Sequence, residues 1–200
     1  MINLKHFDSE ALSSVPCRCG LIGNVFSPED GAALVNSFPR DHFKTVKGYD
    51  GEKGYEYEAR SLIPMGGNAV SDPDYLSPVW RRLAEELRAP GYRDAMSRIS
   101  NLDLSEMTME VNLHHYGKEA WLGPHVDLAD KAVTHVFYFN DSWDIADGGC
   151  LTILKSADMS DAVQIIPPLI GNSVVLVRAT NSWHAVSRVR SGCRVSRRTM

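Results

Sequence analysis

Two short segments of this 200-residue chain carry side chains that could hold a metal together. His125 and Asp127 are separated by one residue, and His184 follows much later. Alternate residues of a strand point to one face, so His125 and Asp127 can aim at one point in space. His184, on a distant strand, would complete a set of two imidazoles and one carboxylate. That ligand set leaves half the coordination sphere open, as non-haem Fe(II) requires to activate oxygen.

A basic side chain and a hydroxyl follow this set. Arg194 lies shortly after His184, and Ser196 is two residues further, on the same face of an extended segment. A guanidinium group matches the geometry of a carboxylate in bidentate fashion. We therefore expect Arg194 and Ser196 to form a fork for a carboxylate.

The second half of the chain has the periodicity of strands. From Met107 onward apolar and polar residues alternate with a period of two, which places Asn112 and Tyr116 on one face. Further strands are expected at Val133–Asn140, Leu151–Leu154, Val163–Ile166, Val174–Arg178, His184–Arg188 and Cys193–Ser196. About eight short strands with dense turn signals predict an antiparallel double-sheet barrel of jelly-roll type. The fold class is thus mainly β with flanking helices, a double-stranded β-helix of the kind seen in cupins.

The first half is mixed. Ser27-Pro28 and Ser77-Pro78 each combine an N-cap serine with a proline at the first helical position, which predicts two helix starts. Strands are expected at Lys44–Tyr49 and Tyr55–Ile63, with a loop over Gly48–Gly54. We therefore expect a single domain, in which residues 1–106 flank a jelly-roll core over residues 107–200.

Composition limits the function classes. Hydrophobic residues make up 44% and charged residues 23%, as in an ordinary globular protein. A net charge of -4 and a pI near 6.0 argue against a general nucleic-acid binder. No apolar run resembles a signal peptide or reaches membrane-spanning length, so we expect no membrane partner. The four cysteines lack zinc-site spacing and are expected to be reduced thiols of a cytoplasmic protein.

The motifs of the second half occur in an order that resembles a known family. They are Tyr116-Gly117, His125-Val126-Asp127, Gly148-Gly149 with Leu151-Thr152, Gly171 before Val174-Val175-Leu176, His184-Ala185-Val186, Val189, Gly192 and Arg194-Val195-Ser196. This set resembles the Fe(II)- and 2-oxoglutarate-dependent dioxygenases, especially the compact prolyl-hydroxylase-like branch. The resemblance extends from about Met107 to the end of the chain.

The resemblance implies roles for the singled-out residues. His125, Asp127 and His184 would be the ligands of Fe(II), with 2-oxoglutarate and O2 as cosubstrates. Because Asp127 supplies the carboxylate that related halogenases lack, the resemblance implies hydroxylation rather than halogenation.

The cosubstrate contacts are also implied by the resemblance. Arg194 would pair with the distal carboxylate of 2-oxoglutarate, helped by Ser196 and Tyr116, with Asn112 as a weaker candidate. Arg190 competes with Arg194, but the spacing from the second histidine in the family favours Arg194.

The expected reaction is hydroxylation of a C–H bond of a small molecule, such as an amino acid or a biosynthetic intermediate, with release of succinate and CO2. Three alternatives stay open: a peptidyl or prolyl-residue hydroxylase, desaturation or ring formation by the same chemistry, and a cupin-like metal-binding protein or isomerase without oxygen chemistry. By position, substrate contacts are expected from the loop Gly48–Gly54 and from Tyr55, Tyr57 and Arg60.

Overall fold

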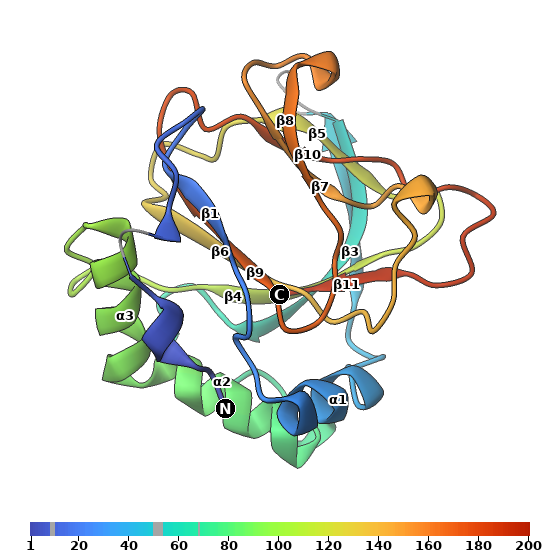
Figure 1. Ribbon diagram of the computed structural model, residues 1–200. Helices are drawn as coiled ribbons and strands as arrows, with labels where there is room; N and C mark the ends of the chain where they lie inside the picture. The colour runs from blue at the N-terminus through green and yellow to red at the C-terminus, as the bar shows by residue number, and fades with distance from the viewer. Residues whose placement is uncertain (9–10, 50–53, 68) are drawn as a thin grey trace.

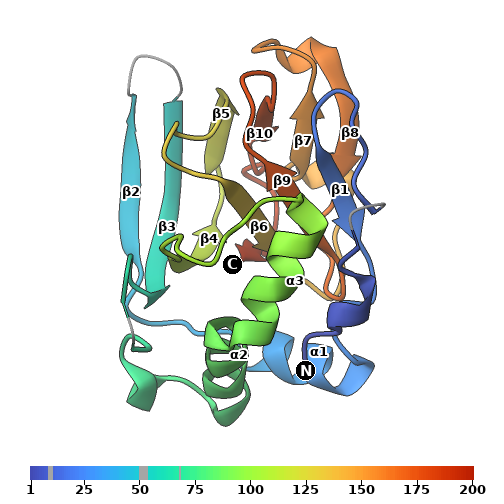
Figure 2. The same cartoon turned by 90° about the vertical axis from the view of Figure 1, so that its left-hand side faces the viewer.

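The computed structural model describes residues 1–8, 11–49, 54–67 and 69–200. Two antiparallel sheets curl toward each other, and the helices pack against the lower end of this half-barrel (Figure 1). Figure 2 shows the same layers from the side, with β2 and β3 far from β1. The mainly β architecture with flanking helices agrees with the fold class expected from the sequence.

The larger sheet has eight strands in the order β11-β4-β3-β5-β10-β7-β8, with β2 paired to β3. Its strands are β2 (Lys44–Tyr49), β3 (Gly54–Ile63), β4 (Val111–Tyr116), β5 (Trp121–His125), β7 (Leu151–Leu154), β8 (Ala162–Ile166), β10 (His184–Val186) and β11 (Arg197–Thr199). The smaller sheet has the order β1-β9-β6 and consists of β1 (Cys19–Ile22), β6 (Val133–Phe137) and β9 (Ser173–Val177). A bridge between Tyr138 and Thr199 joins the two sheets beyond the end of β6.

The N-terminal half contributes more than the flanking region that the sequence predicts. Strand β1 pairs with β9, and β3 pairs with β4 along one part and with β5 along another. The ten-residue length of β3 allows it to span both neighbours. The sheets are therefore built from both halves of the chain.

The last strand lies later than expected. The prediction of a strand over Cys193–Ser196 is wrong, because the chain is still turning there. The N–H of Cys193 donates to the carbonyl of Arg190 at 3.0 Å, which closes the turn at Ser191-Gly192. Pairing with β4 begins only at Arg197, which lies opposite Tyr116.

The helices are α1 (Pro28–Asn36), α2 (Pro78–Arg88) and α3 (Pro90–Ser100). Both predicted helix starts are confirmed, and the Ser27 hydroxyl accepts a hydrogen bond from the N–H of Asp30 at 3.1 Å. The start of α3 was not predicted, because Ala89 offers no capping side chain. Trp80 of α2 is fully buried against Phe139, with ring centroids 4.8 Å apart, so the helices cover one sheet face. No helix among the described residues is long and apolar enough to cross a membrane.

A histidine in this core makes folding sensitive to acid. His135 of β6 packs against Phe137 at 4.0 Å between ring centroids, and its Nδ1 lies 2.8 Å from the Tyr92 hydroxyl. Burial lowers the pKa of His135 to about 3. The unfolded chain therefore binds a proton near its ordinary pKa of about 6.5 while the folded chain does not.

We expect the free energy of unfolding to fall as the pH falls from about 6.5 toward 3, by up to about 4 kcal/mol from this group. Urea unfolding of the wild type and of His135→Phe at pH 7 and pH 4.5 measures the difference. The variant should lose less stability on acidification, and an equal loss in both proteins would contradict this account.

Candidate metal centre and a buried arginine

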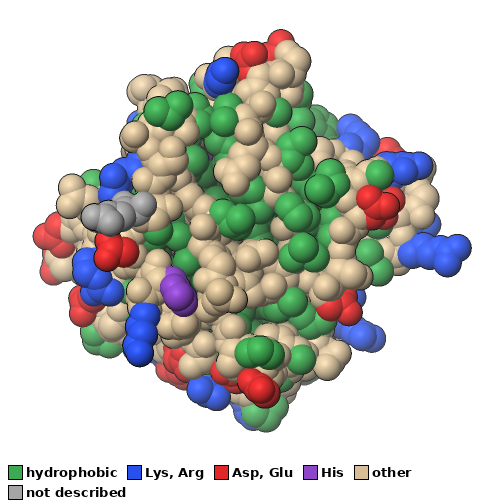
Figure 3. All heavy atoms as spheres, viewed as in Figure 1, with side chains coloured by type: hydrophobic (Ala, Val, Ile, Leu, Met, Phe, Trp, Pro, Cys, Tyr) green, Lys and Arg blue, Asp and Glu red, His purple; other side chains and the backbone are tan. Residues whose placement is uncertain are grey.

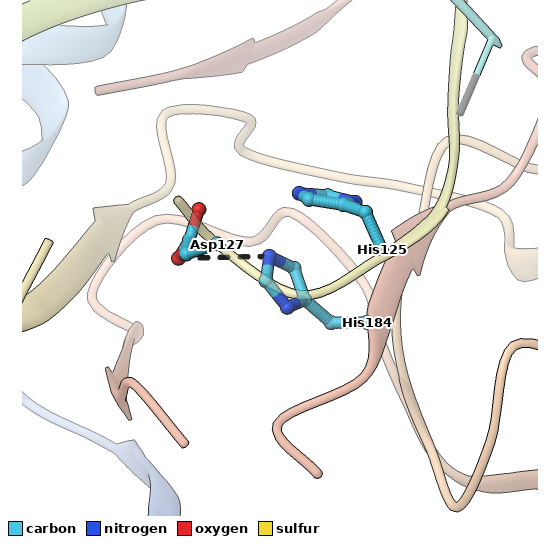
Figure 4. Close-up of side chains that lie close together, drawn as sticks. All are labelled: His125, Asp127 and His184. Carbon is cyan, nitrogen blue, oxygen red and sulfur yellow. Dashed lines mark ion pairs between the residues drawn. The ribbon is translucent and has the colours of Figure 1, made fainter. Parts of the chain in front are cut away.

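Three buried side chains converge where β5 ends and β10 begins. His125 is the last residue of β5, and it lies directly opposite His184, the first residue of β10. Asp127 follows two residues beyond the end of β5, so the ligand pair lies at a strand end and not within one strand as expected. One ligand atom from each residue lies within 4.8 Å of the others. Figure 4 shows the three side chains pointing toward one another.

The main chain orients both imidazoles. The Nδ1 of His125 lies 2.9 Å from the carbonyl oxygen of Gly123, and that of His184 lies 2.9 Å from the carbonyl oxygen of Ser182. A carbonyl only accepts, so each Nδ1 carries the hydrogen and donates it. In the neutral imidazole, Nε2 is then the nitrogen with a lone pair, which is the form that binds a metal.

The carboxylate of Asp127 is held by two neighbours. The Thr134 hydroxyl donates to Oδ2 at 2.7 Å, and the Lys131 ammonium donates to Oδ1 at 3.3 Å. Burial acts to raise the pKa of Asp127, but nearby His184 and Lys131, the Thr134 hydrogen bond and His125 together hold it below its usual value. The group is therefore an anion that can serve as a metal ligand.

Thr134 is expected to support metal binding without touching the metal. Because its hydroxyl orients Asp127, Thr134→Val should weaken Fe(II) affinity by about tenfold, as for other partners of metal ligands. Anaerobic Fe(II) titration followed by calorimetry measures the change. Thr45→Val, on the exposed face of β2, is the matched control and should bind as the wild type does. Equal affinity in both variants would rule out this role.

A buried guanidinium lies in the same barrel. Arg197 of β11 is 3% exposed and lies opposite Tyr116 on β4. Its guanidinium carbon is 4.6 Å from the ring centre of Tyr116 and 5.9 Å from that of Tyr138. Nη1 donates to the Thr199 hydroxyl at 3.2 Å. The Nε of Arg197 and the hydroxyl of Tyr138 are both buried without a hydrogen-bond partner among the described residues.

The titratable side chains around Arg197, which are Tyr116, Tyr138 and His114, are held in their neutral forms. Burial raises the pKa of Tyr116 and of Tyr138, although Arg197 opposes the shift, so both phenols keep their O–H groups. Burial, together with the charges of Arg197 and Lys131, lowers the pKa of His114 to about 4. The charge of Lys131 acts on both His114 and Asp127. A cation with neutral O–H donors around it suits an anion.

The structure separates the residues that the sequence grouped with the metal ligands. Arg194 is exposed, and Ser196 is half-buried with its hydroxyl against His115. Tyr116, which was also predicted to contact the cosubstrate, is buried with its ring against the guanidinium of Arg197. Asn112 is half-buried on β4 opposite Ser61.

The residues that the sequence did not indicate are Arg197, Tyr138, Thr134 and Lys131. For Arg197 a signal existed, because Arg197-x-Thr199 repeats the Arg-x-hydroxyl pattern of Arg194-x-Ser196 three positions later. The other three have no pattern that marks them.

The positions expected to contact substrate are divided between two faces of β3. Tyr57 stacks on Tyr116 with ring centroids 5.1 Å apart, and Tyr55 lies beside Tyr57 at 6.1 Å. Arg60 lies on the opposite face, where its guanidinium pairs with Asp41. Residues 50–53 of the expected loop lie outside the described residues.

Comparison with known proteins relates the second half of the chain to a family. Residues 111–200 match the profile of the 2OG-Fe(II) oxygenase superfamily. No curated protein matches the sequence. Among solved structures, the chain is similar to a 2OG-Fe(II) oxygenase family oxidoreductase from Burkholderia pseudomallei, at 14% identity and a TM-score of 0.63, covering 90% of this chain and 82% of that one.

Two prolyl hydroxylases have similar folds. The prolyl-4-hydroxylase from Pseudomonas putida is 19% identical with a TM-score of 0.62, over 90% of this chain and 89% of that one. The prolyl hydroxylase from Trichoplax adhaerens was solved with a hypoxia inducible factor peptide fragment. It is 13% identical with a TM-score of 0.63, over 90% of this chain and 80% of that one. These likenesses show the jelly-roll fold. The profile match indicates the 2OG-Fe(II) oxygenase family, whose enzymes use Fe(II), 2-oxoglutarate and O2. The profile match over residues 111–200, together with the shared fold and the His125, Asp127 and His184 set, supports a 2-oxoglutarate-dependent dioxygenase of the 2OG-Fe(II) oxygenase superfamily.

Proposed function

We propose that this chain hydroxylates a C–H bond of a small molecule, such as an amino acid or a biosynthetic intermediate. The observation that carries the proposal is the buried set of His125, Asp127 and His184, whose ligand atoms lie within 4.8 Å of one another. Two imidazoles and one carboxylate are the donors that non-haem Fe(II) oxygenases use. Bound iron and 2-oxoglutarate would supply the oxygen activation that yields succinate, CO2 and a hydroxylated product.

The protein's own contribution is orientation and exclusion of water. Each of the three ligands is no more than 9% exposed, so the metal site is shielded from bulk solvent. The carbonyls of Gly123 and Ser182 hold the two imidazoles in the metal-binding tautomer. Fixed ligands in a dry site are the protein's part in this chemistry.

We assign the distal carboxylate of 2-oxoglutarate to Arg197 rather than to Arg194. Arg197 is buried in the barrel and its Nε lacks a protein partner among the described residues, whereas Arg194 is exposed. The unpartnered hydroxyl of Tyr138 provides a second donor. A guanidinium with a neighbouring O–H group fits a carboxylate, and a buried cation of this kind is stabilised by an anion.

Hydroxylation of a prolyl residue within a peptide is the second candidate. It is favoured by the similarity to the two prolyl hydroxylases, one of which was solved with a peptide fragment. The small molecule is preferred because all three metal ligands are buried.

Anaerobic titration of the chain with Fe(II) and then 2-oxoglutarate tests the cofactor assignment. A visible charge-transfer band is expected when 2-oxoglutarate chelates the iron, and its absence would refute the assignment. Under oxygen, succinate release should be screened with free amino acids and with proline-containing peptides, and products examined for one added oxygen atom. Stimulation by peptides alone would replace the small-molecule proposal by the second candidate.

A further inference from the structure

Strand β11 carries two arginines in a row, and only one of them can enter the barrel. Arg197 is 3% exposed inside, while Arg198 lies on the opposite face, with its guanidinium carbon 5.7 Å from the ring centre of Phe38. Shifting a strand by one residue moves every side chain to the other face. Because both residues are arginines, residue type alone distinguishes poorly between the two registers. The strand is only three residues long, so its few backbone hydrogen bonds with β4 do little to favour one register over the other.

Side-chain hydrogen bonds on the outer face fasten the residue before the strand. The Ser196 hydroxyl lies 2.5 Å from Nε2 of His115, whose Nδ1 lies 2.7 Å from a carboxylate oxygen of Glu58. A carboxylate only accepts, so Nδ1 donates to Glu58, and in the neutral imidazole Nε2 accepts from Ser196. We call Glu58, His115 and Ser196 the outer relay. It connects β3, β4 and the segment before β11.

Asn140 holds the same segment through hydrogen bonds to its main chain. Its Nδ2 donates to the carbonyl of Ser196 at 2.8 Å, and its Oδ1 accepts from the N–H of Arg198 at 2.9 Å. Asn140 is 4% exposed, so these bonds are shielded from water. A shift by one residue would break both bonds as well as the contact between Ser196 and His115.

We propose that the outer relay, together with Asn140, sets the register of β11 and thereby places Arg197, not Arg198, inside the barrel. Ser196 and His115 are then positioning residues for the cosubstrate pocket, which makes the inference partly dependent on the proposed function. This gives Ser196 a role near the cosubstrate that acts through its neighbour and not by contact.

Ser196, His115 and Glu58 are hydrogen-bonded in series, and a serine-hydrolase triad also has a hydroxyl, an imidazole and a carboxylate in this arrangement. Such a triad needs N–H groups directed at the oxygen of the intermediate. The N–H of Arg198, two residues beyond Ser196, already donates to Asn140. That N–H group is therefore not available to an intermediate at Ser196.

Chemical modification of the metal-free protein tests the register directly. Phenylglyoxal labelling followed by peptide mass spectrometry would compare Arg197 with Arg194, which is exposed and serves as the internal reference. Losing one hydrogen bond of the relay should raise the relative labelling of Arg197 about fivefold in Ser196→Ala. Ser196→Thr keeps the hydroxyl and should restore protection. Ser191→Ala, in the exposed turn, should label as the wild type does.

A second variant and a second measurement separate the possible failures. Glu58→Gln weakens the relay at its outer end and covers the case in which Ser196→Ala does not fold. Unchanged labelling of Arg197 in a folded relay variant would overturn the register inference. In the iron-loaded enzyme, Ser196→Ala should raise the KM for 2-oxoglutarate while kcat changes little. Increased labelling with an unchanged KM would leave the register inference standing and refute the assignment of Arg197 as the cosubstrate anchor.

Discussion

Replacing His184 by alanine is expected to reduce Fe(II)-dependent succinate formation by more than about a hundredfold, because one of three metal ligands is lost. The charge-transfer band of the Fe(II) and 2-oxoglutarate complex should disappear with it. Both effects are measured on one preparation, by anaerobic absorption spectra and by succinate assay.

A histidine distant from the metal site provides the control. His6 is exposed in the short N-terminal 3-10 helix η1 (Leu4–His6), so His6→Ala should keep the band and the activity. An unchanged band in His184→Ala would remove this residue from the ligand set. Loss of the band in both variants would point to a general effect of histidine removal on the preparation.

The second large effect is expected at Arg197. Hydrogen bonds to charged groups contribute about 1.5–3 kcal/mol, so Arg197→Ala should raise the KM for 2-oxoglutarate by about ten- to a hundredfold. Arg197→Lys keeps the charge but lacks the planar fork. Its KM for 2-oxoglutarate should therefore lie between those of the wild type and Arg197→Ala. Arg194→Ala, which changes an exposed side chain, should leave the KM within about twofold of the wild type.

Steady-state succinate kinetics at varied 2-oxoglutarate decide between the two arginines. Thermal unfolding of each variant shows whether the loss of the guanidinium above Tyr116 also destabilises the barrel. If Arg194→Ala raised the KM and Arg197→Ala did not, the anchor would be Arg194, as the sequence spacing predicts.

The chemistry of the metal centre was easier to predict than its geometry. Two histidines and one aspartate are identifiable by type, and the structure brings those three together. Their position relative to the strands was harder to predict. The sequence indicated a loop up to Pro124 and a strand from His125, whereas β5 ends at His125. Gly123 and Pro124 have weak strand propensity, and pairing with β10 overrides it.

The arginine that enters the barrel could not be predicted from sequence pattern. Arg194-x-Ser196 and Arg197-x-Thr199 carry the same pattern in windows three residues apart. An odd offset reverses the face in a strand, so the start of β11 decides the outcome. That start depends on contacts with Asn140 and His115, which are distant in sequence. Likewise, sequence reasoning did not place β1 and β3 in the barrel sheets, because their partner strands lie more than a hundred positions away or across helices.

The carbonyl groups that orient the two imidazoles have a further consequence for how this protein can diverge. Each carbonyl belongs to the residue two positions before the histidine, and it is a main-chain group. Any amino acid at positions 123 and 182 that keeps the local backbone path presents the same oxygen. The orientation of the two imidazoles therefore depends on main-chain groups, whereas that of the Asp127 carboxylate depends on the side chains of Thr134 and Lys131. A change of side chain at position 123 or 182 should therefore alter the orientation of an imidazole only if it moves the backbone.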